Sequence, residues 1–482
     1  MGWERKRGKL EEFNALTLGG GSDAFRWIYG NESRLAGVRY VITLDSDTVL
    51  PPTEAAAIVG AIAHPLNRAV LTNPGEEPAR VLRGYGVLQP RINVSLTSAH
   101  RSYFAHIFSG QPGVDPYTVS VSDVYQDLFD EGSFTGKGIY DVEAFTRTMA
   151  GQFPENALLS HDLIEGIHAR AALATDLALF DDFPRLYLTW SLRKHRWMRG
   201  DWQLLRWLRG RPPAALGPSR IRFSLLSRWK MADNLRRSME DPALLLMLVA
   251  GWIVLPGTPL FWTFLVLGAM AAPYVIALGT AALQPPWEKS WRPYYRALVR
   301  DARRSAQQFA LTVCFLPDQA LLAIDAMVRT VWRVFVSRRR LLEWHTASQV
   351  EHRGGRLLQE RWRRLAPALA LTGTIALLVV IKTRMEGAEG AGIDLPAIRF
   401  AVAALPLIVL WGLAPRIMRI ISRPTVRPAR KLRASERRDA FRYAALHWRF
   451  YETFVTEKTQ WLAPDNYQEE PGNATARRTS PT

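Results

Sequence analysis

The chain of 482 residues contains one cysteine, Cys314, and nine histidines. A single cysteine excludes an intramolecular disulfide and a cysteine-rich zinc module. The histidines form no H-E-x-x-H pair, and the chain has no G-x-S-x-G elbow, so neither a zinc protease nor an α/β-hydrolase is indicated. Residues 1–9 also lack the apolar core of a secretory signal. We therefore expect later segments to direct any membrane insertion.

Acidic side chains are scarce in the second part of the chain. Residues 1–189 carry 16 basic and 23 acidic side chains, whereas residues 190–482 carry 46 basic and 21 acidic ones. The overall charge of +18 therefore comes from the second part, which also contains long apolar stretches. Nucleic-acid binding requires a basic, solvated surface, so this distribution argues against a nucleic-acid partner.

The sequence of residues 1–189 predicts an α/β domain with an open sheet. Residues 38–44 are mostly β-branched and aromatic, as in a buried strand, and an Ala/Ile-rich helix is expected to end at Ala63. Short strands are expected at 69–71 and 86–89, and a helical stretch at about 93–108. Ligands of open α/β sheets gather at the carboxyl ends of strands, which is where Asp45 and Asp47 fall.

Apolar runs in the second part predict membrane-spanning helices. Residues 242–283 carry no charge and are interrupted only by Pro256-Gly257-Thr258-Pro259, which indicates two helices joined by a short turn. Residues 365–381 and 398–413 form a second predicted hairpin, although a buried core helix would also explain the first of these runs. Residues 309–336 mix apolar residues with arginines, a pattern that favours an amphipathic interfacial helix.

Loop charges predict how these helices are oriented. Segments 190–241, 284–364 and the tail from 415 are all strongly basic, whereas the turn at 256–259 and the loop at 382–396 are not. The positive-inside rule therefore places the α/β domain, the middle loop and the tail in the cytoplasm.

Two acidic motifs could carry chemistry. Asp45-Ser46-Asp47 ends a predicted strand, where the chain can turn both carboxylates toward one Mg²⁺ or Mn²⁺, although a solvated turn explains the pattern equally well. Asp162 begins a predicted helix over residues 163–173 and is either a plain helix cap or a base that accepts a proton from a hydroxyl group.

Two further segments have more than one interpretation. Arg193, Arg196 and Trp197 lie in a run of cations and indoles that suits either a phosphate and sugar clamp or a basic helix near anionic lipid. Gly132 to Asp141 is glycine-rich but is not a phosphate loop, because Ile139 follows Gly138 where a P-loop needs Lys-Ser or Lys-Thr. A glycine-rich turn that lets the backbone approach a ligand fits this segment better.

In their order along the chain, these motifs resemble those of membrane-integrated family 2-like glycosyltransferases, the group of cellulose and hyaluronan synthases. That pattern consists of Lys-x-Gly, D-x-D, a glycine-rich acceptor segment, an acidic base and (Q/R)-x-x-R-W. Here the matching residues are Lys6 and Gly8, Asp45 and Asp47, Gly132 to Asp141, Asp162, and Arg193, Arg196 and Trp197. The joint occurrence in order is far more specific than any single motif.

The residues around these motifs point to a narrower group of enzymes. The strings YVITLDSDT, GSFTGKGIYDVEAF, LLSHDLIEG and HRWMRGDWQ closely resemble the glycosyltransferase region of bacterial cyclic β-1,2-glucan synthases. Members of that family are several times longer and extend on both sides of this chain. The resemblance therefore implies a fragment, with a GT-A-like α/β glycosyltransferase domain that is incomplete at its N-terminus and is followed by an α-helical transmembrane region.

The resemblance also implies a division of the chain into five parts. These are a cytoplasmic GT-A-like domain (1–240), a transmembrane hairpin (241–283), a basic cytoplasmic loop with the interfacial helix (284–364), a second transmembrane hairpin (365–422) and a cytoplasmic linker toward a missing glycoside-hydrolase or phosphorylase-like region (423–482). The expected location is the bacterial inner membrane.

By the same resemblance, the chain transfers glucose from UDP-glucose to a growing β-1,2-glucan with inversion, in contact with the lipid bilayer. Asp45 and Asp47 would hold Mg²⁺ or Mn²⁺ on the diphosphate, and Asp162 would deprotonate the acceptor hydroxyl. The remaining assignments are nucleotide-sugar binding by Lys6, Gly8, Arg193 and Arg196, and acceptor binding by Gly132, Ser133 and Trp197. The alternative is a truncated, catalytically inactive membrane subunit or scaffold.

Overall fold

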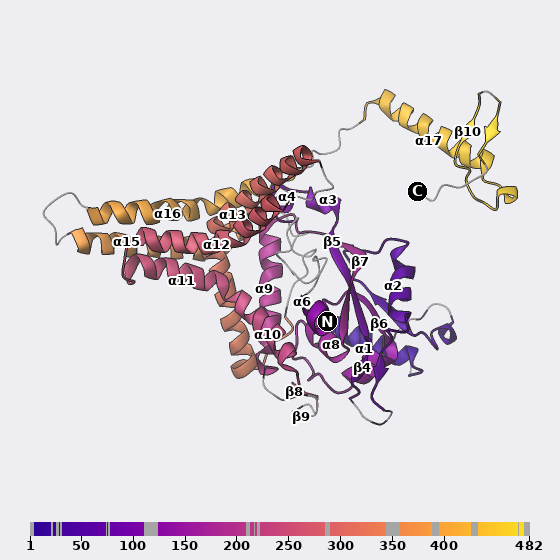
Figure 1. Ribbon diagram of the computed structural model, residues 1–482, viewed down its shortest axis with the longest axis horizontal. Helices are drawn as coiled ribbons and strands as arrows, with labels where there is room; N and C mark the ends of the chain where they lie inside the picture. Colours follow the sequence, from indigo (N-terminus) through magenta and orange to yellow (C-terminus); the bar gives the residue numbers. More distant parts are fainter. Residues whose placement is uncertain are drawn as a thin grey trace. The chain divides into compact units, whose positions relative to one another are not determined.

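The computed structural model forms two compact units, Met1–Thr425 and Val426–Thr482, which are described separately (Figure 1). The residues that the structure describes are 4–20, 23–25, 28, 31–73, 75, 78–109, 124–208, 213–215, 217–218, 222–284, 290–343, 357–387, 395–425, 432–470 and 472–476.

The first unit contains a mixed five-stranded sheet in the order β1-β6-β5-β7-β2. Its strands are β1 (Tyr40–Thr43), β2 (Thr48–Val49), β5 (Val87–Val94), β6 (Gly138–Asp141) and β7 (Ala171–Asp181). β5 and β7 pair in parallel, while β6 runs antiparallel to both β1 and β5. The strand predicted at 38–44 is confirmed as β1, so Asp45 follows a strand end as expected.

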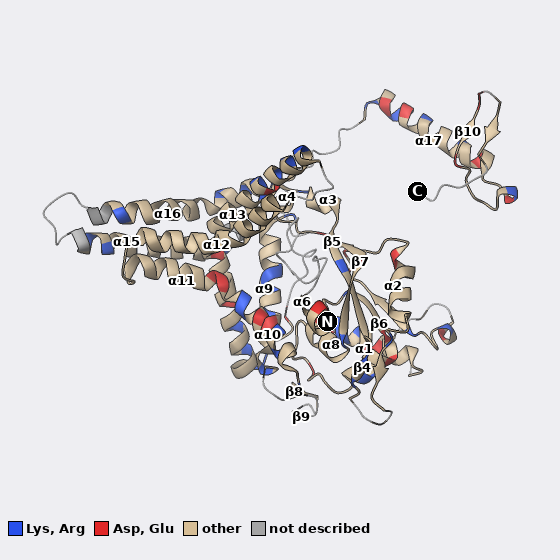
Figure 2. Ribbon diagram, in the orientation of Figure 1, with Lys and Arg blue, Asp and Glu red and all other residues tan. Residues whose placement is uncertain are grey.

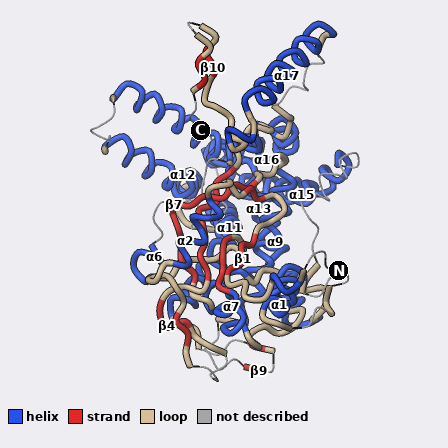
Figure 3. Tube along the Cα trace, turned by 90° about the vertical axis from the view of Figure 1, so that its right-hand side faces the viewer, coloured by secondary structure: helices blue, strands red, loops and turns tan. Residues whose placement is uncertain are grey.

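Helices cover both faces of the sheet (Figure 3). Leu88 and Ile139 pack against α2 (Glu54–Ala63), whereas their chain neighbours Val87 and Tyr140 pack against α7 (Val142–Met149) and α8 (Asp162–His168). Successive side chains of a strand point to opposite faces, so each strand contributes to two separate apolar layers. This arrangement confirms an α/β domain, while the GT-A assignment stays a prediction.

Shorter elements complete the α/β part. They are α1 (Arg5–Thr17), η1 (Glu32–Arg34), β3 (Val70–Leu71), β4 (Val81–Arg83), α3 (Leu96–Ala99), α4 (Tyr103–Phe108), α6 (Val124–Phe129), α9 (Tyr187–Gln203), η2 (Leu204–Arg206), β8 (Pro213–Ala214), β9 (Gly217–Pro218) and α10 (Leu225–Ser238). The predicted strand at 69–71 and the helical stretch near 93–108 thus have counterparts in β3, α3 and α4, although β5 continues to Val94.

The helix predicted over 163–173 is wrong in its last turn. α8 ends at His168, Arg170 takes a left-handed φ of 52°, and Ala171 begins β7. The Ala- and Leu-rich sequence favours a helix locally, but pairing with β5 buries this segment in the sheet. Such tertiary pairing overrides intrinsic propensity.

Apolar helices make up the rest of the first unit. They are α11 (Glu240–Ile253), α12 (Pro259–Leu283), α13 (Trp291–Trp332), continued by the π turn η3 (Arg333–Ser337), α15 (Leu357–Gly387) and α16 (Leu395–Ile421). Figure 2 shows few charged residues along the middle of α12, α15 and α16. Phe264, Ile276, Leu377 and Val402 expose more than half of their surface there, which suits contact with lipid tails.

Within the described residues, four helices are long and apolar enough to cross a membrane: Pro259–Leu283, Trp291–Ser337, Arg364–Met385 and Ile398–Ile421. The second predicted hairpin therefore has both of its helices. In the first predicted hairpin, α11 has 14 residues, fewer than the roughly 20 that a membrane span needs. Only α12 of that hairpin therefore qualifies as a span. The segment 309–336, predicted to be interfacial, belongs to a helix that by length and composition also qualifies as a span, so its interfacial placement stays a prediction.

α13 packs against the other apolar helices and against α9 of the α/β domain. Val313, Leu316 and Ala320 are buried in the apolar cluster with α11, α12, α15 and α16. On the α9 side, Tyr187 donates a hydrogen bond to Asp318 at 2.6 Å, and Gln319 donates one to the Tyr187 hydroxyl at 2.6 Å. α13 thus connects the α/β domain to the membrane helices.

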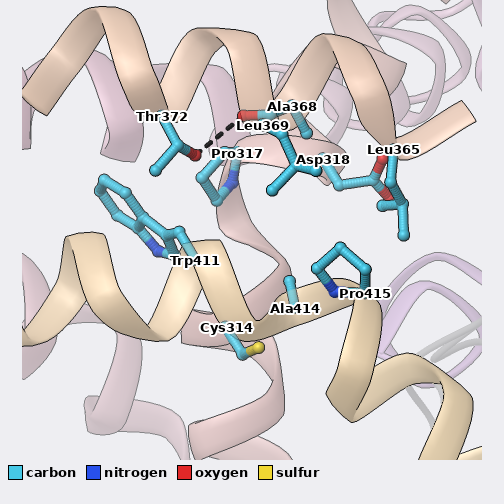
Figure 4. A pocket seen from close by; sticks show the side chains of 10 residues that line it. All are labelled: Cys314, Pro317, Asp318, Leu365, Ala368, Leu369, Thr372, Trp411, Ala414 and Pro415. Atoms are coloured by element: carbon cyan, nitrogen blue, oxygen red, sulfur yellow. Dashed lines mark hydrogen bonds between the residues drawn. The ribbon is translucent and has the colours of Figure 1, made fainter. Parts of the chain in front are cut away.

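A small pocket lies between α13, α15 and α16 (Figure 4). Its walls include Cys314, Trp411 and Ala414, and its polar groups come from Asp318 and Thr372. Thr372 is engaged by its own helix, since its hydroxyl donates to the carbonyl of Ala368 at 2.8 Å. The carboxylate of Asp318 is engaged by Tyr187, so the polar groups of this pocket serve the packing of the helices.

The second unit is built around α17 (Ala434–Phe454), followed by η4 (Glu457–Thr459) and the two-stranded hairpin β10 (Tyr467–Gln468) and β11 (Ala474–Thr475). The rings of Phe454 and Tyr467 lie 4.7 Å apart and join the helix to the hairpin.

We predict that Tyr187→Phe destabilises the first unit. The change leaves the half-buried Asp318 carboxylate and the buried Gln319 amide without their shared partner, which costs about 1–3 kcal/mol and lowers the melting temperature in detergent. Tyr295→Phe is the matched control, because the Tyr295 hydroxyl makes one long, exposed bond of 3.3 Å. Equal melting temperatures for the two variants would contradict the prediction.

Candidate active site

Asp45 lies where β1 ends and the chain turns toward β2. The turn is closed by a hydrogen bond of 3.0 Å from the Thr48 amide to the Asp45 carbonyl, and β2 then pairs with β7. Each carboxylate oxygen of Asp45 contacts a lysine: Oδ1 lies 2.8 Å from Lys6 Nζ and Oδ2 lies 3.3 Å from Lys137 Nζ. Burial alone would raise the pKa of Asp45, but these two ammonium groups lower it below its ordinary value.

Lys6 joins the first two sequence motifs. From α1, its ammonium group also donates to the carbonyl of Gly136 at 2.7 Å, and the hydroxyl of Thr43 donates to the same carbonyl at 3.2 Å. The glycine-rich segment is thereby fixed against the end of β1. Sequence reasoning placed Lys6 and Asp45 in one site, and the structure brings them into direct contact.

Lys137 is the site residue that sequence reasoning missed. It is 7% exposed and forms ion pairs with Asp45 and with Asp181, which is 6% exposed at the end of β7. A buried cation between two carboxylates is stable because each charge offsets the cost of desolvating the others. The available signal was a lysine inside the otherwise uncharged run GSFTGKGIY, which is atypical of a buried strand entry.

Asp47 differs from Asp45 in being exposed, and the structure shows no hydrogen bond or ion pair from it to any described residue. A hard divalent cation prefers carboxylate oxygens of this kind and keeps positions open for phosphate oxygens. The residues present therefore fit Mg²⁺ or Mn²⁺, with Asp47 as the more accessible ligand and Asp45 available after a lysine has moved away.

Asp162 begins α8 beside the glycine-rich segment. A Cβ atom on Gly136 would lie 2.5 Å from Asp162 Oδ1, so only glycine lets the carboxylate approach this closely. Gly136 also has a φ of +84°, which L-residues rarely adopt. A pocket next to Asp162 is lined mainly by residues of α1, β1, the glycine-rich segment and α8, among them Lys6, Thr43, Phe134, Gly136, His161 and Glu165.

Two buried ionisable groups accompany Asp162. His161 Nδ1 lies 2.7 Å from Glu165 Oε1 and 3.7 Å from Asp162 Oδ1. Grouped titratable side chains of this kind also occur in metal sites. Here, however, the contact of 2.7 Å is an ion pair, because two ligands each about 2.1 Å from a metal at a usual angle lie farther apart.

α9 brings Arg193, Arg196 and Trp197 to the site. Burial lowers the pKa of Arg196, as does the neighbouring Arg193, while the carboxylates of Asp162, Asp45 and Asp47 oppose this effect. Arg196 is therefore within electrostatic range of all three acidic residues. The guanidinium of Arg193 stacks over the Trp197 ring at 4.7 Å from its centre.

Other predicted site residues have mainly packing contacts. The amide of Gly132 donates to the carbonyl of Ala171 at 2.7 Å, and the buried Lys230 donates to the carbonyl of Gly132 at 2.9 Å. Ser133 is 6% exposed, and its hydroxyl has no hydrogen-bond partner among the described residues. Gly8 is buried within α1. Neither Gly132 nor Ser133 lines the pocket beside Asp162, whereas Phe134 and Gly136 of the same segment do.

Comparison with known proteins identifies a relative for the whole chain. Over 487 aligned residues, all of this chain is 40% identical to the cyclic β-(1,2)-glucan synthase NdvB of Rhizobium meliloti (strain 1021). The chain spans 16% of the length of that relative. No family model matches the chain. Together with the four apolar helices, this identity indicates a membrane-associated protein and confirms the resemblance to the cyclic β-1,2-glucan synthases.

Proposed function

We propose that this chain is an inverting glucosyltransferase that transfers glucose from UDP-glucose to a growing β-1,2-glucan chain. The observation that carries the proposal is the convergence of Asp45, Asp47 and Asp162 around Arg196. These acidic residues come from two separate parts of the chain, the end of β1 and the start of α8, yet their charges act on one guanidinium of α9. The printed name of the relative, which is a cyclic β-(1,2)-glucan synthase, supports the choice of reaction.

Asp162 acts as the base of this reaction. Its side chain is 28% exposed at the start of α8, so an acceptor hydroxyl can reach the carboxylate from its open side. The acceptor oxygen attacks the anomeric carbon while its proton passes to Asp162, and the bond from that carbon to the diphosphate breaks. A single in-line displacement of this kind inverts the anomeric configuration.

Positive charge stabilises the departing nucleotide. Arg196 lies at the carboxylate cluster, and Arg193 is its neighbour on α9, so both guanidinium groups can pair with diphosphate oxygens. Bound Mg²⁺ or Mn²⁺ would neutralise developing charge on the diphosphate, with Asp47 and Asp45 as its protein ligands. Lys6 and Gly8 of α1 lie on the nucleotide side of the site in this proposal, and Lys6 keeps Asp45 ionised when no nucleotide is present.

The acceptor chain occupies the other side of the site. Trp197 offers a ring face for a sugar, and the glycine-rich segment that contains Gly132 and Ser133 reaches the site through Phe134 and Gly136. We further place the α/β domain in the cytoplasm of a bacterium and the apolar helices in the inner membrane, because segment 190–241 and the tail from 415 are both strongly basic, as cytoplasmic flanks are.

We predict that Asp162→Asn lowers the rate of glucan formation by about 10²–10⁴-fold in membranes supplied with UDP-glucose, because asparagine cannot accept the hydroxyl proton. Incorporation of radiolabelled glucose into glucan measures the rate. Asp176→Asn is the matched control, since Asp176 is exposed on β7. An Asp162→Asn rate equal to that of the control would remove Asp162 from the role of base.

We also predict that UDP binding requires a divalent cation and that Asp47→Asn weakens it. Calorimetric titration of the purified chain with UDP, with Mg²⁺ and then with EDTA, tests this without turnover. The proposal expects saturable binding that EDTA abolishes in the wild-type chain, and at least tenfold weaker binding in Asp47→Asn, with Asp176→Asn unchanged. Absence of metal-dependent UDP binding would instead favour the catalytically inactive membrane subunit or scaffold.

A further inference from the structure

A buried imidazole and a buried carboxylate stand behind Asp162. His161 is 8% exposed and Glu165 is 2% exposed, although both belong to residue types that prefer solvent. Their side chains are joined at 2.7 Å, and the same imidazole nitrogen lies 3.7 Å from Asp162. Burying this pair is costly unless each charge has a partner, so the arrangement calls for an explanation beyond packing.

Three charged groups act on the imidazole of His161. Glu165 and Asp162 face it from α8, and Arg7 faces it from α1, where Arg7 is itself paired with Glu4 at 3.1 Å. Burial and Arg7 favour the neutral ring, whereas the two carboxylates favour the cation. Glu165 makes the strongest of the favourable contributions, and the pKa of His161 rises to about 9. His161 is therefore an imidazolium at neutral pH.

Asp162 is confined on two sides by this arrangement. The backbone of Gly136 covers one side of the carboxylate, with no room for a side chain, and the His161 cation stands next to its Oδ1 atom. A fixed charge at this distance restricts the rotation of the carboxylate. A base that is correctly oriented before the acceptor arrives needs less rearrangement in the transition state.

We propose that His161, paired with Glu165, is a positioning residue that holds Asp162 oriented toward the acceptor hydroxyl. This inference rests on the proposed function, since it assigns Asp162 the role of base. In the reaction the hydroxyl proton passes to Asp162, the acceptor oxygen bonds to the anomeric carbon, and the electron pair of the broken bond leaves with the UDP. His161 keeps its own proton throughout and touches no reacting atom.

The first test is a titration of His161 that does not depend on activity. Carbon-13-labelled histidine in the full chain, in detergent, gives one NMR signal for each imidazole, and His161→Gln assigns the relevant one. The proposal expects a midpoint near 9 in the wild type and below the ordinary 6.5 in Glu165→Gln, because burial remains while its compensation is lost. A wild type in which no histidine signal titrates near pH 9 overturns the proposal even if no variant folds.

The second test is the pH dependence of glucan formation. His161 loses its proton as the pH rises, and kcat should fall with that loss. The basic limb of the kcat profile therefore lies near pH 9 in the wild type and below about pH 6.5 in Glu165→Gln. At pH 7.5 we expect kcat of the variant to fall at least tenfold, but less than the loss of the base itself would cause, with KM for UDP-glucose little changed.

His168→Gln is the matched control on the same helix. His168 is equally buried, but it packs on the rings of Phe153 and Phe223, and burial alone lowers its pKa to about 4. Its replacement therefore leaves the basic limb near pH 9. If the basic limb of the Glu165→Gln profile lies at the same pH as that of His168→Gln, the positioning role is overturned.

The two tests separate this inference from the proposed function. A shifted His161 titration without glucan formation by the wild-type chain supports the ion pair and counts against the proposed function. Glucan formation with an unshifted basic limb in Glu165→Gln supports the proposed function and overturns the positioning role.

Discussion

The packing of α9 between the sheet and α13 is the constraint on which the rest of the site depends. Near its start, Tyr187 is hydrogen-bonded to Asp318 and Gln319 of α13. Near its end, the amide of Gln203 donates to the carbonyl of Leu341 at 3.0 Å. Between these contacts, the helix presents Arg196 to the acidic cluster. A helix held at both ends has little freedom to move, so the contacts of α9 with α13 fix the position of Arg196.

The opposite half of the site is organised by two lysines. Lys6 and Lys137 approach Asp45 from α1 and from the glycine-rich segment, and Lys137 continues to Asp181 at the end of β7. Strand ends that carry like charges would repel each other, and the two ammonium groups offset this repulsion. The acidic edge of the sheet is thereby held together by ion pairs, while Asp47 stays exposed.

Local sequence signals predicted the parts of the fold that depend on neighbouring residues. The β-branched run before Asp45 specified β1, and the uncharged stretches specified the apolar helices. Contacts between distant segments were not predictable in this way. The start of β7 was taken for helix because its pairing with β5 is nonlocal. The contact of Lys137 with Asp181 requires β6 and β7 to be assembled first. The short length of α11, by contrast, is visible in the sequence, because Asp241 and Pro256 bound its apolar run.

The central claim is that these converging residues transfer glucose from UDP-glucose into a β-1,2-linked glucan. The most direct measurement is NMR of the product formed when membranes containing the full chain are incubated with carbon-13-labelled UDP-glucose. The account predicts labelled glucosyl units joined through oxygen 2 in the β configuration, which is the inverted one. Labelled product in the α configuration or with another linkage, or no labelled glucan at all, would contradict it.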